Sequence, residues 1–220
     1  MEDVIAYQLT HNFEGKTVSL LDLCRFGSLR VITICLSLLG FFSYAMYYAP
    51  TLIIGQFGFN IYINNIMVTV ADTFSLIALV FYVTKIPRRS SSLVFFLIAT
   101  VLALILVFVT VPDGCDICAE SITQLVIIVI FRFCVAFVFN IYQIYMCELF
   151  PARVRGIGTG FVSAGGTVGS TISPIYLGVL RRQGINVMLF FVVFGLIGMA
   201  NLTLLDETLG QPMKEEILEI

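Results

Sequence analysis

Residues 92–111, SLVFFLIATVLALILVFVTV, contain no ionisable side chain. A run of ~20 apolar residues is the length of helix that crosses the ~30 Å hydrocarbon core of a bilayer. A strand of a transmembrane β-barrel would alternate between polar and apolar residues over ~10 positions. Uninterrupted runs such as VMLFFVVFGLIG, at 187–198, exclude that alternation. The stretch therefore predicts a transmembrane α-helix.

The composition extends this prediction to the whole chain. Hydrophobic residues make up 59% of the sequence and charged residues 12%, about half the charged share of a soluble domain. The net charge of −2 and the absence of a basic tract argue against nucleic acid as a partner. We expect an all-α membrane protein whose partner is the lipid bilayer, with six transmembrane helices at about 31–49, 60–84, 92–111, 122–147, 156–180 and 186–205.

The two ends of the chain are predicted to lie on the cytoplasmic side. Residues 1–30 include VSLLDLCRFGSLR, which alternates apolar and charged residues and favours an amphipathic lead-in helix at the interface. Residues 206–220 form a polar tail. If the N-terminus is inside, nine Lys and Arg residues gather on the inner side and only Arg181 and Arg182 on the outer side. This bias predicts a multi-pass protein with both termini in the cytoplasm.

The turn CELFPARVRGIGTG, at 147–160, joins the fourth and fifth predicted spans. A second basic turn, TKIPRR at 84–89, is expected on the same side. Such turns can carry a charge relay, in which an acid pairs with an arginine in one conformation and releases it in another. They are also the ordinary anchors of membrane topology. The candidate gating residues are Glu148, Arg153, Arg155, Arg88 and Arg89.

Four stretches resemble the major facilitator superfamily, in its organic cation/anion transporter branch. ELFPARVRGIGTG resembles the signature turn after the tenth helix, and SLLDLCRFGSLR, at 19–30, the segment before the seventh. TKIPRR resembles the turn after the eighth helix, with Lys85 and Pro87 in place of aspartate and glycine. DETLGQPMKEEI, at 206–217, resembles the segment after the twelfth helix. The resemblance implies that the six spans are helices seven to twelve.

A complete transporter of this superfamily has two six-helix halves with the substrate site between them. One half alone would present the wall of that cavity to lipid, where exposed polar groups are costly. The chain is therefore expected to be a fragment, to pair with a second half in a separate chain or homodimer, or to serve as a structural subunit.

Asp72 is the only ionisable residue of the second predicted span. Burying its charge costs at least ~2.5–3.5 kcal/mol on insertion scales, so it should face a cavity or a partner. Asn65, seven residues earlier, shares its helical face. The resemblance implies that Asp72 stands where organic cation transporters carry a substrate-attracting glutamate. The alternatives are a substrate or proton-coupling role and pairing with a neighbouring helix.

Arg132 begins a polar stripe on the fourth span, with Asn140 and Gln143 near the same face. Arg132 is expected either to contact substrate, to pair with Asp72 or to extend outward. On the first span, Tyr44 is the aromatic residue best placed to face a cavity. The resemblance implies a charged residue near position 167, where this chain has Thr167. The predicted substrate is therefore a small organic solute, with Asp72 as the residue that favours a cation.

The sequence does not predict an enzyme. It shows no phosphate loop and no nucleophile–base pair, and Cys115 and Cys118 lack the two further ligands that a zinc site needs. We expect no catalytic residue, metal or cofactor. Two functions remain: half of a secondary transporter working by alternating access, or a transporter-derived assembly subunit without transport. The polar stripe favours the first, and the missing half and Thr167 favour the second.

The predicted topology can be tested by labelling introduced cysteines from either side of the membrane. Residues in the 112–121 loop should react with an impermeant reagent from outside, and residues in the 85–90 turn only after permeabilisation. The reverse pattern, or five spans, would contradict the predicted architecture.

Overall fold

The computed structural model describes residues 27–53, 61–82, 85, 87–109, 119–152, 154–205 and 207. These residues form six α-helices and no strand. The helices are α3 (Gly27–Ile53), α4 (Ile61–Tyr82), α5 (Arg88–Phe108), α6 (Ala119–Leu149), α7 (Arg155–Arg182) and α8 (Met188–Leu202). The all-α fold with six helices is confirmed. Residues 27–30 of the predicted lead-in form the start of α3. Its earlier residues, Arg153, Cys115 and Cys118 lie outside the described residues.

Four of the described helices, α3 to α6, are long and apolar enough to cross a membrane. The longest, α6, has 31 residues, or about 46 Å at 1.5 Å per residue. The 28 residues of α7 are rich in Gly, Ser and Thr, so their hydropathy is lower. The 15 residues of α8 are strongly apolar but extend only about 22 Å. The predicted span of 186–205 is therefore longer than this helix.

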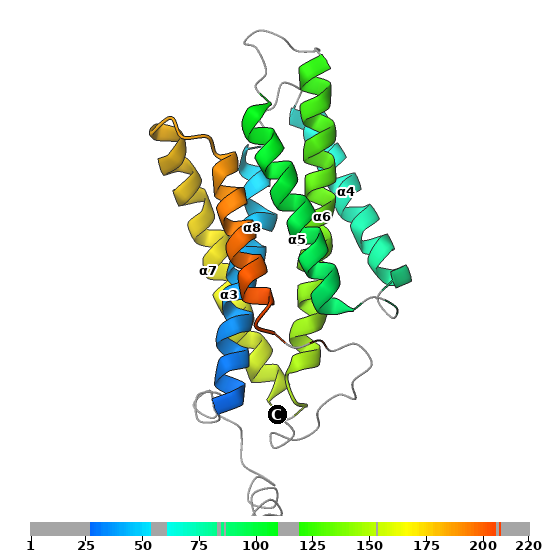
Figure 1. Cartoon of the computed structure of the whole chain (residues 1–220), viewed down its shortest axis with the longest axis vertical. Helices are drawn as coiled ribbons and strands as arrows, with labels where there is room; N and C mark the ends of the chain where they lie inside the picture. The colour runs from blue at the N-terminus through cyan, green and yellow to red at the C-terminus, as the bar shows by residue number, and fades with distance from the viewer. Residues whose placement is uncertain are drawn as a thin grey trace, which may run out of the picture.

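Helices α3 and α6 occupy the middle of the bundle (Figure 1). Helix α3 packs against α6, α7 and α8, and α6 packs against α3, α4 and α5. Helix α5 also packs on α8, whereas α4 packs mainly on α6 and α7 mainly on α3. This order places α4 and α7 at opposite flanks of the central pair. Polar side chains on α3, α4 and α6 can therefore meet.

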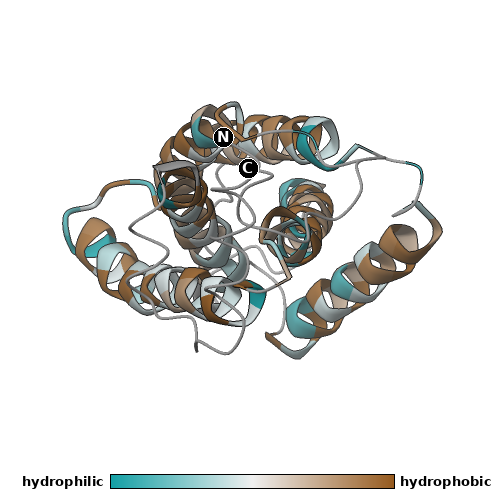
Figure 2. Cartoon of the chain, turned by 90° about the horizontal axis from the view of Figure 1, so that it is seen from below, coloured by the Kyte–Doolittle hydropathy of each residue, from teal (hydrophilic) through white to brown (hydrophobic). Residues whose placement is uncertain are grey.

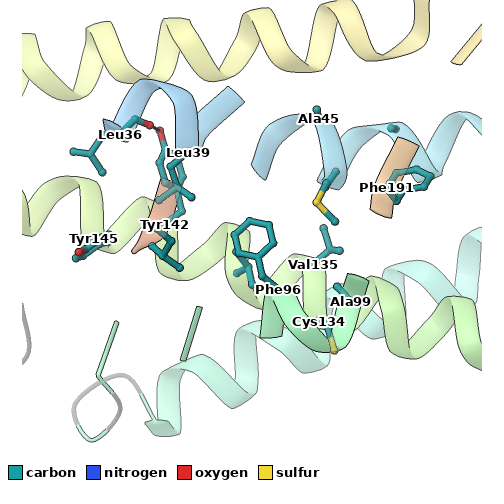
Figure 3. Packing of buried hydrophobic residues seen from close by; sticks show 14 of the residues in the cluster. Leu36, Leu39, Ala45, Phe96, Ala99, Cys134, Val135, Tyr142, Tyr145 and Phe191 are labelled. Atoms are coloured by element: carbon teal, nitrogen blue, oxygen red, sulfur yellow. Dashed lines mark hydrogen bonds between the residues drawn. The ribbon is translucent and has the colours of Figure 1, made fainter. Parts of the chain in front are cut away.

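Most of the core is one apolar cluster drawn from all six helices, and a smaller cluster lies between α4 and α6. Figure 3 shows part of the larger cluster, with Leu36 and Leu39 of α3 beside Tyr142 of α6. The Tyr142 hydroxyl donates to the Leu36 carbonyl at 3.4 Å, which satisfies a polar group inside an apolar core. Hydrophobic colour covers much of each helix in Figure 2. Exposed side chains such as Phe74 and Phe81 on α4 suit contact with lipid tails.

Glycines on α7 let it approach α3 closely. Gly165 lies against Ser37, Gly166 against the Tyr44 ring and Gly169 against the Phe41 carbonyl. Because small residues replace side-chain bulk at this interface, the two backbones can pack at short range. Gly156 and Gly160, on the same helix, have open space where a side chain would lie. The close contact is therefore confined to one face of α7.

Substitution of Gly169 should test this contact. In Gly169→Ala the new methyl group meets the Phe41 backbone, and the strain should lower stability by about 1–3 kcal/mol. The matched control is Gly178→Ala, also on α7, where nothing lies within 4 Å. Thermal unfolding can be followed with a thiol-reactive dye that detects the buried Cys35 and Cys134, after accessible thiols have been blocked. Equal melting temperatures for the two variants would contradict the close approach.

Candidate functional site

An ion pair joins α4 to α6 in the middle of the bundle. Arg132 Nε donates to Asp72 Oδ1 at 2.7 Å, and Arg132 Nη2 donates to Asp72 Oδ2 at 2.7 Å. This two-point contact matches the planar fork of a guanidinium to a carboxylate. The Arg132 side chain is 3% exposed and that of Asp72 is 23% exposed. The Arg132 side chain is therefore buried in the bundle, and the Asp72 carboxylate lies on its more exposed side.

Tyr47 of α3 completes the surroundings of this pair. Its hydroxyl donates to Asp72 Oδ2 at 3.1 Å, and its backbone carbonyl accepts from Arg132 Nη1. The Arg132 guanidinium lies 4.0 Å from the centre of the Tyr47 ring, which is a cation–π contact. Three helices therefore share one charged cluster, made of Asp72, Arg132 and Tyr47, which we call the central charge cluster.

The central charge cluster is stable only as a unit. A buried ion pair offsets its desolvation when its geometry is good and further hydrogen bonds are made. Here each of the three guanidinium nitrogens of Arg132 makes a hydrogen bond. Removing one partner from such a pair leaves an uncompensated charge, at a cost of about 3–5 kcal/mol. With both partners present, the cluster carries no net charge.

Aromatic rings line the same region. Phe139 of α6 stacks on Tyr47, with centroids 4.3 Å apart and planes 11° from parallel. Tyr44 meets Phe139 edge to face at 4.9 Å, and Tyr48, which is exposed, contacts both Tyr44 and Phe139. Rings in this arrangement offer a flat apolar surface next to the charges. Phe139 was not predicted from the sequence, although it lies seven residues after Arg132 and so on the same helical face.

The other predicted site residues separate into two groups. Asn140 donates to the Ser75 hydroxyl of α4 at 3.2 Å, and Gln143 donates to the Tyr44 hydroxyl of α3 at 3.1 Å. Both therefore join α6 to a neighbour close to the central charge cluster. Asn65 is exposed and donates to the Ile61 carbonyl of its own helix at 2.9 Å. In this conformation the Asn65 amide bonds to its own helix and not to the central charge cluster.

A second polar group gathers at the end of the bundle where α6 and α8 end and α5 begins. Arg88 Nη2 lies 2.9 Å from Glu148 Oε1, and both side chains are partly exposed. The Glu207 carboxylate accepts from the backbone N–H groups of Arg88 and Arg89 at 2.7 and 3.1 Å. Arg89 Nη2 donates to the Thr203 carbonyl at 2.7 Å. We call these five residues the end cluster.

Glu207 acts as a helix cap supplied from a distant part of the sequence. The N-cap residue of α5 is Pro87, which makes no side-chain capping bond. The Glu207 carboxylate satisfies N–H groups there and interacts favourably with the positive end of the helix dipole. Glu207 lies in the DETLGQPMKEEI segment, and its capping role was not predicted from the sequence. Arg155 Nε donates to the Phe150 carbonyl at 3.4 Å within the turn before α7.

These features can be compared with known proteins. A sequence profile of the Major Facilitator Superfamily matches residues 10–174. The chain belongs to the major facilitator superfamily. It is a multi-pass membrane protein of the branch related to the organic anion and cation transporters, because its curated relatives are members of solute carrier family 22.

Three relatives illustrate the likeness within the superfamily. Solute carrier family 22 member 6 of Bos taurus is 29% identical over 94% of this chain and 36% of its own length. Solute carrier family 22 member 13 of Homo sapiens is 24% identical over 97% of this chain and 37% of its own. Organic anion transporter 3 of Oryctolagus cuniculus is 28% identical over 89% and 35%. The chain therefore spans little more than a third of the length of these relatives.

The role of Glu207 can be measured without a transport assay. Glu207→Ala should speed amide hydrogen exchange at Arg88–Ser90 by about tenfold or more, because hydrogen bonds to charged groups contribute about 1.5–3 kcal/mol. The control is Glu120→Ala, which removes an exposed acid from the first turn of α6. Unchanged exchange at the start of α5 would show that the cap does not hold the two segments together.

Proposed function

We propose that this chain forms one six-helix half of a secondary transporter that moves a small organic anion across a membrane by alternating access. The proposal draws on the superfamily and on relatives named as solute carriers and an organic anion transporter. It makes the protein a transporter rather than an enzyme. The second half is either another part of a longer chain or a separate subunit, and the substrate site lies between the halves near the midplane.

The observation that favours an anionic substrate is the set of hydrogen bonds that Asp72 already accepts. Both of its oxygens accept from Arg132, and one also accepts from Tyr47. Asp72 is therefore committed to the guanidinium and is a poor free counter-ion for a cationic substrate. Arg132 is the only basic residue within the predicted spans, and its fork matches a carboxylate. This arrangement favours an organic anion over the cation that the sequence suggested.

The aromatic rings favour a substrate with an apolar or aromatic body. Tyr44, Tyr48 and Phe139 lie beside the central charge cluster, and Tyr48 is exposed on that face. An aromatic monocarboxylate would place its carboxylate toward Arg132 and its ring against these side chains, where each ring pair contributes about 0.5–1.5 kcal/mol. Gln143 and Asn140 add amide groups at the edge of the same site.

The end cluster is the proposed gate. Arg88–Glu148 joins α5 to α6, and Glu207 with Arg89 joins the segment after α8 to α5. These contacts are partly exposed, so water can replace them when they break, which suits contacts that must form and break in each transport cycle. Arg155 and Arg153 remain candidates for the same gate through the turn before α7.

Uptake measurements in cells that contain the chain together with its second half test the proposal. Radiolabelled benzoate should enter, and benzyltrimethylammonium, a cation of similar size, should not. Arg132→Gln should reduce benzoate uptake by at least about tenfold, because it removes a charge-assisted bond worth about 1.5–3 kcal/mol. The matched control is Arg181→Gln, which removes an exposed arginine at the end of α7.

Surface protein is quantified for every variant, so that loss of uptake is not confused with loss of folding. Entry of the cation in place of benzoate would reverse the predicted substrate charge. Absence of uptake for both compounds, in every assembly that places the protein in the membrane, would favour the assembly-subunit function.

A further inference from the structure

Helices α3 and α6 meet at a second polar contact, separate from the central charge cluster. Gln143 Nε2 donates to the Tyr44 hydroxyl at 3.1 Å, and the Tyr44 ring meets the Phe139 ring edge to face at 4.9 Å. Along α6, Gln143 lies one turn, or about 6 Å, beyond Phe139, on the side away from Arg132. One face of α6 therefore carries a cation, then an aromatic ring, then an amide.

This contact uses only part of the hydrogen-bonding capacity of the two side chains. A tyrosine hydroxyl can donate as well as accept, and a glutamine amide has a carbonyl oxygen besides its two N–H groups. Within the part of the chain that the structure describes, the Tyr44 hydroxyl proton has no acceptor and the Gln143 carbonyl oxygen has no donor. The contact is only partly buried, and the Gln143 oxygen is not enclosed by the bundle. A donor and an acceptor therefore lie side by side, available to a ligand.

Gly166 of α7 determines where the Tyr44 ring lies. A methyl group at position 166 would come within 2.7 Å of the ring, so only glycine leaves room for it. The ring also packs against Phe139 and, edge to face at 6.2 Å, against Tyr142. The Tyr44 hydroxyl is thereby held beside Gln143 before any ligand arrives, and a group that is already ordered costs less to bind.

We propose, building on the anion-transport function above, that Tyr44 and Gln143 form a subsite for a hydroxyl or amide group at the end of the substrate distant from its carboxylate. The Tyr44 hydroxyl donates to the oxygen of that group, and the Gln143 carbonyl oxygen accepts its O–H or N–H. The body of the substrate lies against Phe139. Gly166 is a positioning residue, because it acts through Tyr44.

The chemistry of the subsite also limits the substrate to one negative charge. Tyr44 and Gln143 carry no formal charge, so a second carboxylate at this end would lose its hydration without gaining a counter-charge. The substrate class is therefore an aromatic monocarboxylate with a neutral polar group at its far end.

Binding of matched acids to the full chain in lipid nanodiscs, with its second half where cells supply one, tests the proposal. Three hydroxylated acids of increasing length are each compared with the parent acid: para-hydroxybenzoate with benzoate, para-hydroxyphenylpropionate with phenylpropionate, and para-hydroxyphenylpentanoate with phenylpentanoate. Near neutral pH the carboxylates are ionised and the phenols are not. For at least one pair, isothermal titration should show that the hydroxyl raises affinity by about fivefold or more, as expected for one net hydrogen bond.

Substitutions then locate this gain in affinity. Tyr44→Phe and Gln143→Met each remove one hydrogen-bonding partner at nearly constant size, and each should reduce the gain to about twofold or less. Gly166→Ala should do the same by moving the Tyr44 ring. The controls on α7 are Tyr176→Phe, which removes an exposed hydroxyl, and Gly178→Ala, where nothing lies within 4 Å. Both controls should keep the full gain. If the contact only tied α3 to α6, its loss would weaken hydroxylated and parent acids alike and leave their ratio unchanged.

The outcomes separate this inference from the proposed function. If the parent acids bind but no pair shows the gain, or if Tyr44→Phe and Gln143→Met both keep it, the subsite is wrong and anion transport stands. If no acid of the series binds, the proposed anion site is wrong as well. Where a variant does not fold, a para-azido analogue photolysed on the unaltered protein should label α3, α6 or α7 beside Tyr44. Labelling confined to α4, α5 or α8 would overturn the subsite.

Discussion

A guanidinium buried at mid-membrane depth needs a counter-charge and an acceptor for its N–H groups, and most of this site follows from meeting that need. Arg132 obtains the charge from Asp72 on α4 and a backbone acceptor from Tyr47 on α3. Three helices are thereby fixed relative to one another by one side chain. Because removing either charged partner costs about 3–5 kcal/mol, the cluster constrains how α3, α4 and α6 can move separately.

The close packing of α7 on α3 helps to hold α3 in the position that the central charge cluster requires. Gly166 leaves room for the Tyr44 ring, and Gly40 on α3 leaves room for the Tyr142 hydroxyl. Tyr44 can then lie against Phe139 and accept a hydrogen bond from Gln143. The glycines therefore do more than allow two helices to pack closely. They also leave room for large aromatic side chains between α3, α6 and α7.

The sequence was informative where one residue type has few acceptable environments. The apolar run of 92–111 predicted a spanning helix, and a lone acid and a lone arginine within spans predicted an ion pair as one alternative. It was less informative where several environments suit a residue. Tyr47 could equally have been an interfacial tyrosine, and Phe139 an ordinary lipid-facing or core residue. Asn65 shares a helical face with Asp72, yet its amide bonds to its own helix.

Glu207 was missed for a different reason, because its partners are backbone N–H groups at the start of α5, more than a hundred residues away. Backbone groups carry no sequence signal, and only the packed bundle brings the two segments together. The length of α8 was overestimated because hydropathy continues past Leu202 into residues that no longer form the helix.

Helix α6 carries one member of each ionic contact in the site and the proposed gate. Arg132 joins it to α4, and Glu148 joins it to α5, about 24 Å further along the axis at 1.5 Å per residue. Helices α4 and α5 follow each other in the chain through the TKIPRR turn, so both contacts hold the same helical pair against α6. An anion that separates Arg132 from Asp72 would leave Glu148–Arg88 as the remaining ionic tie between them. Because that tie is partly exposed, it is the weaker of the two. Under the proposed transport function, substrate binding would therefore lower the cost of moving the α4–α5 pair away from α6, which is the kind of linkage that alternating access needs.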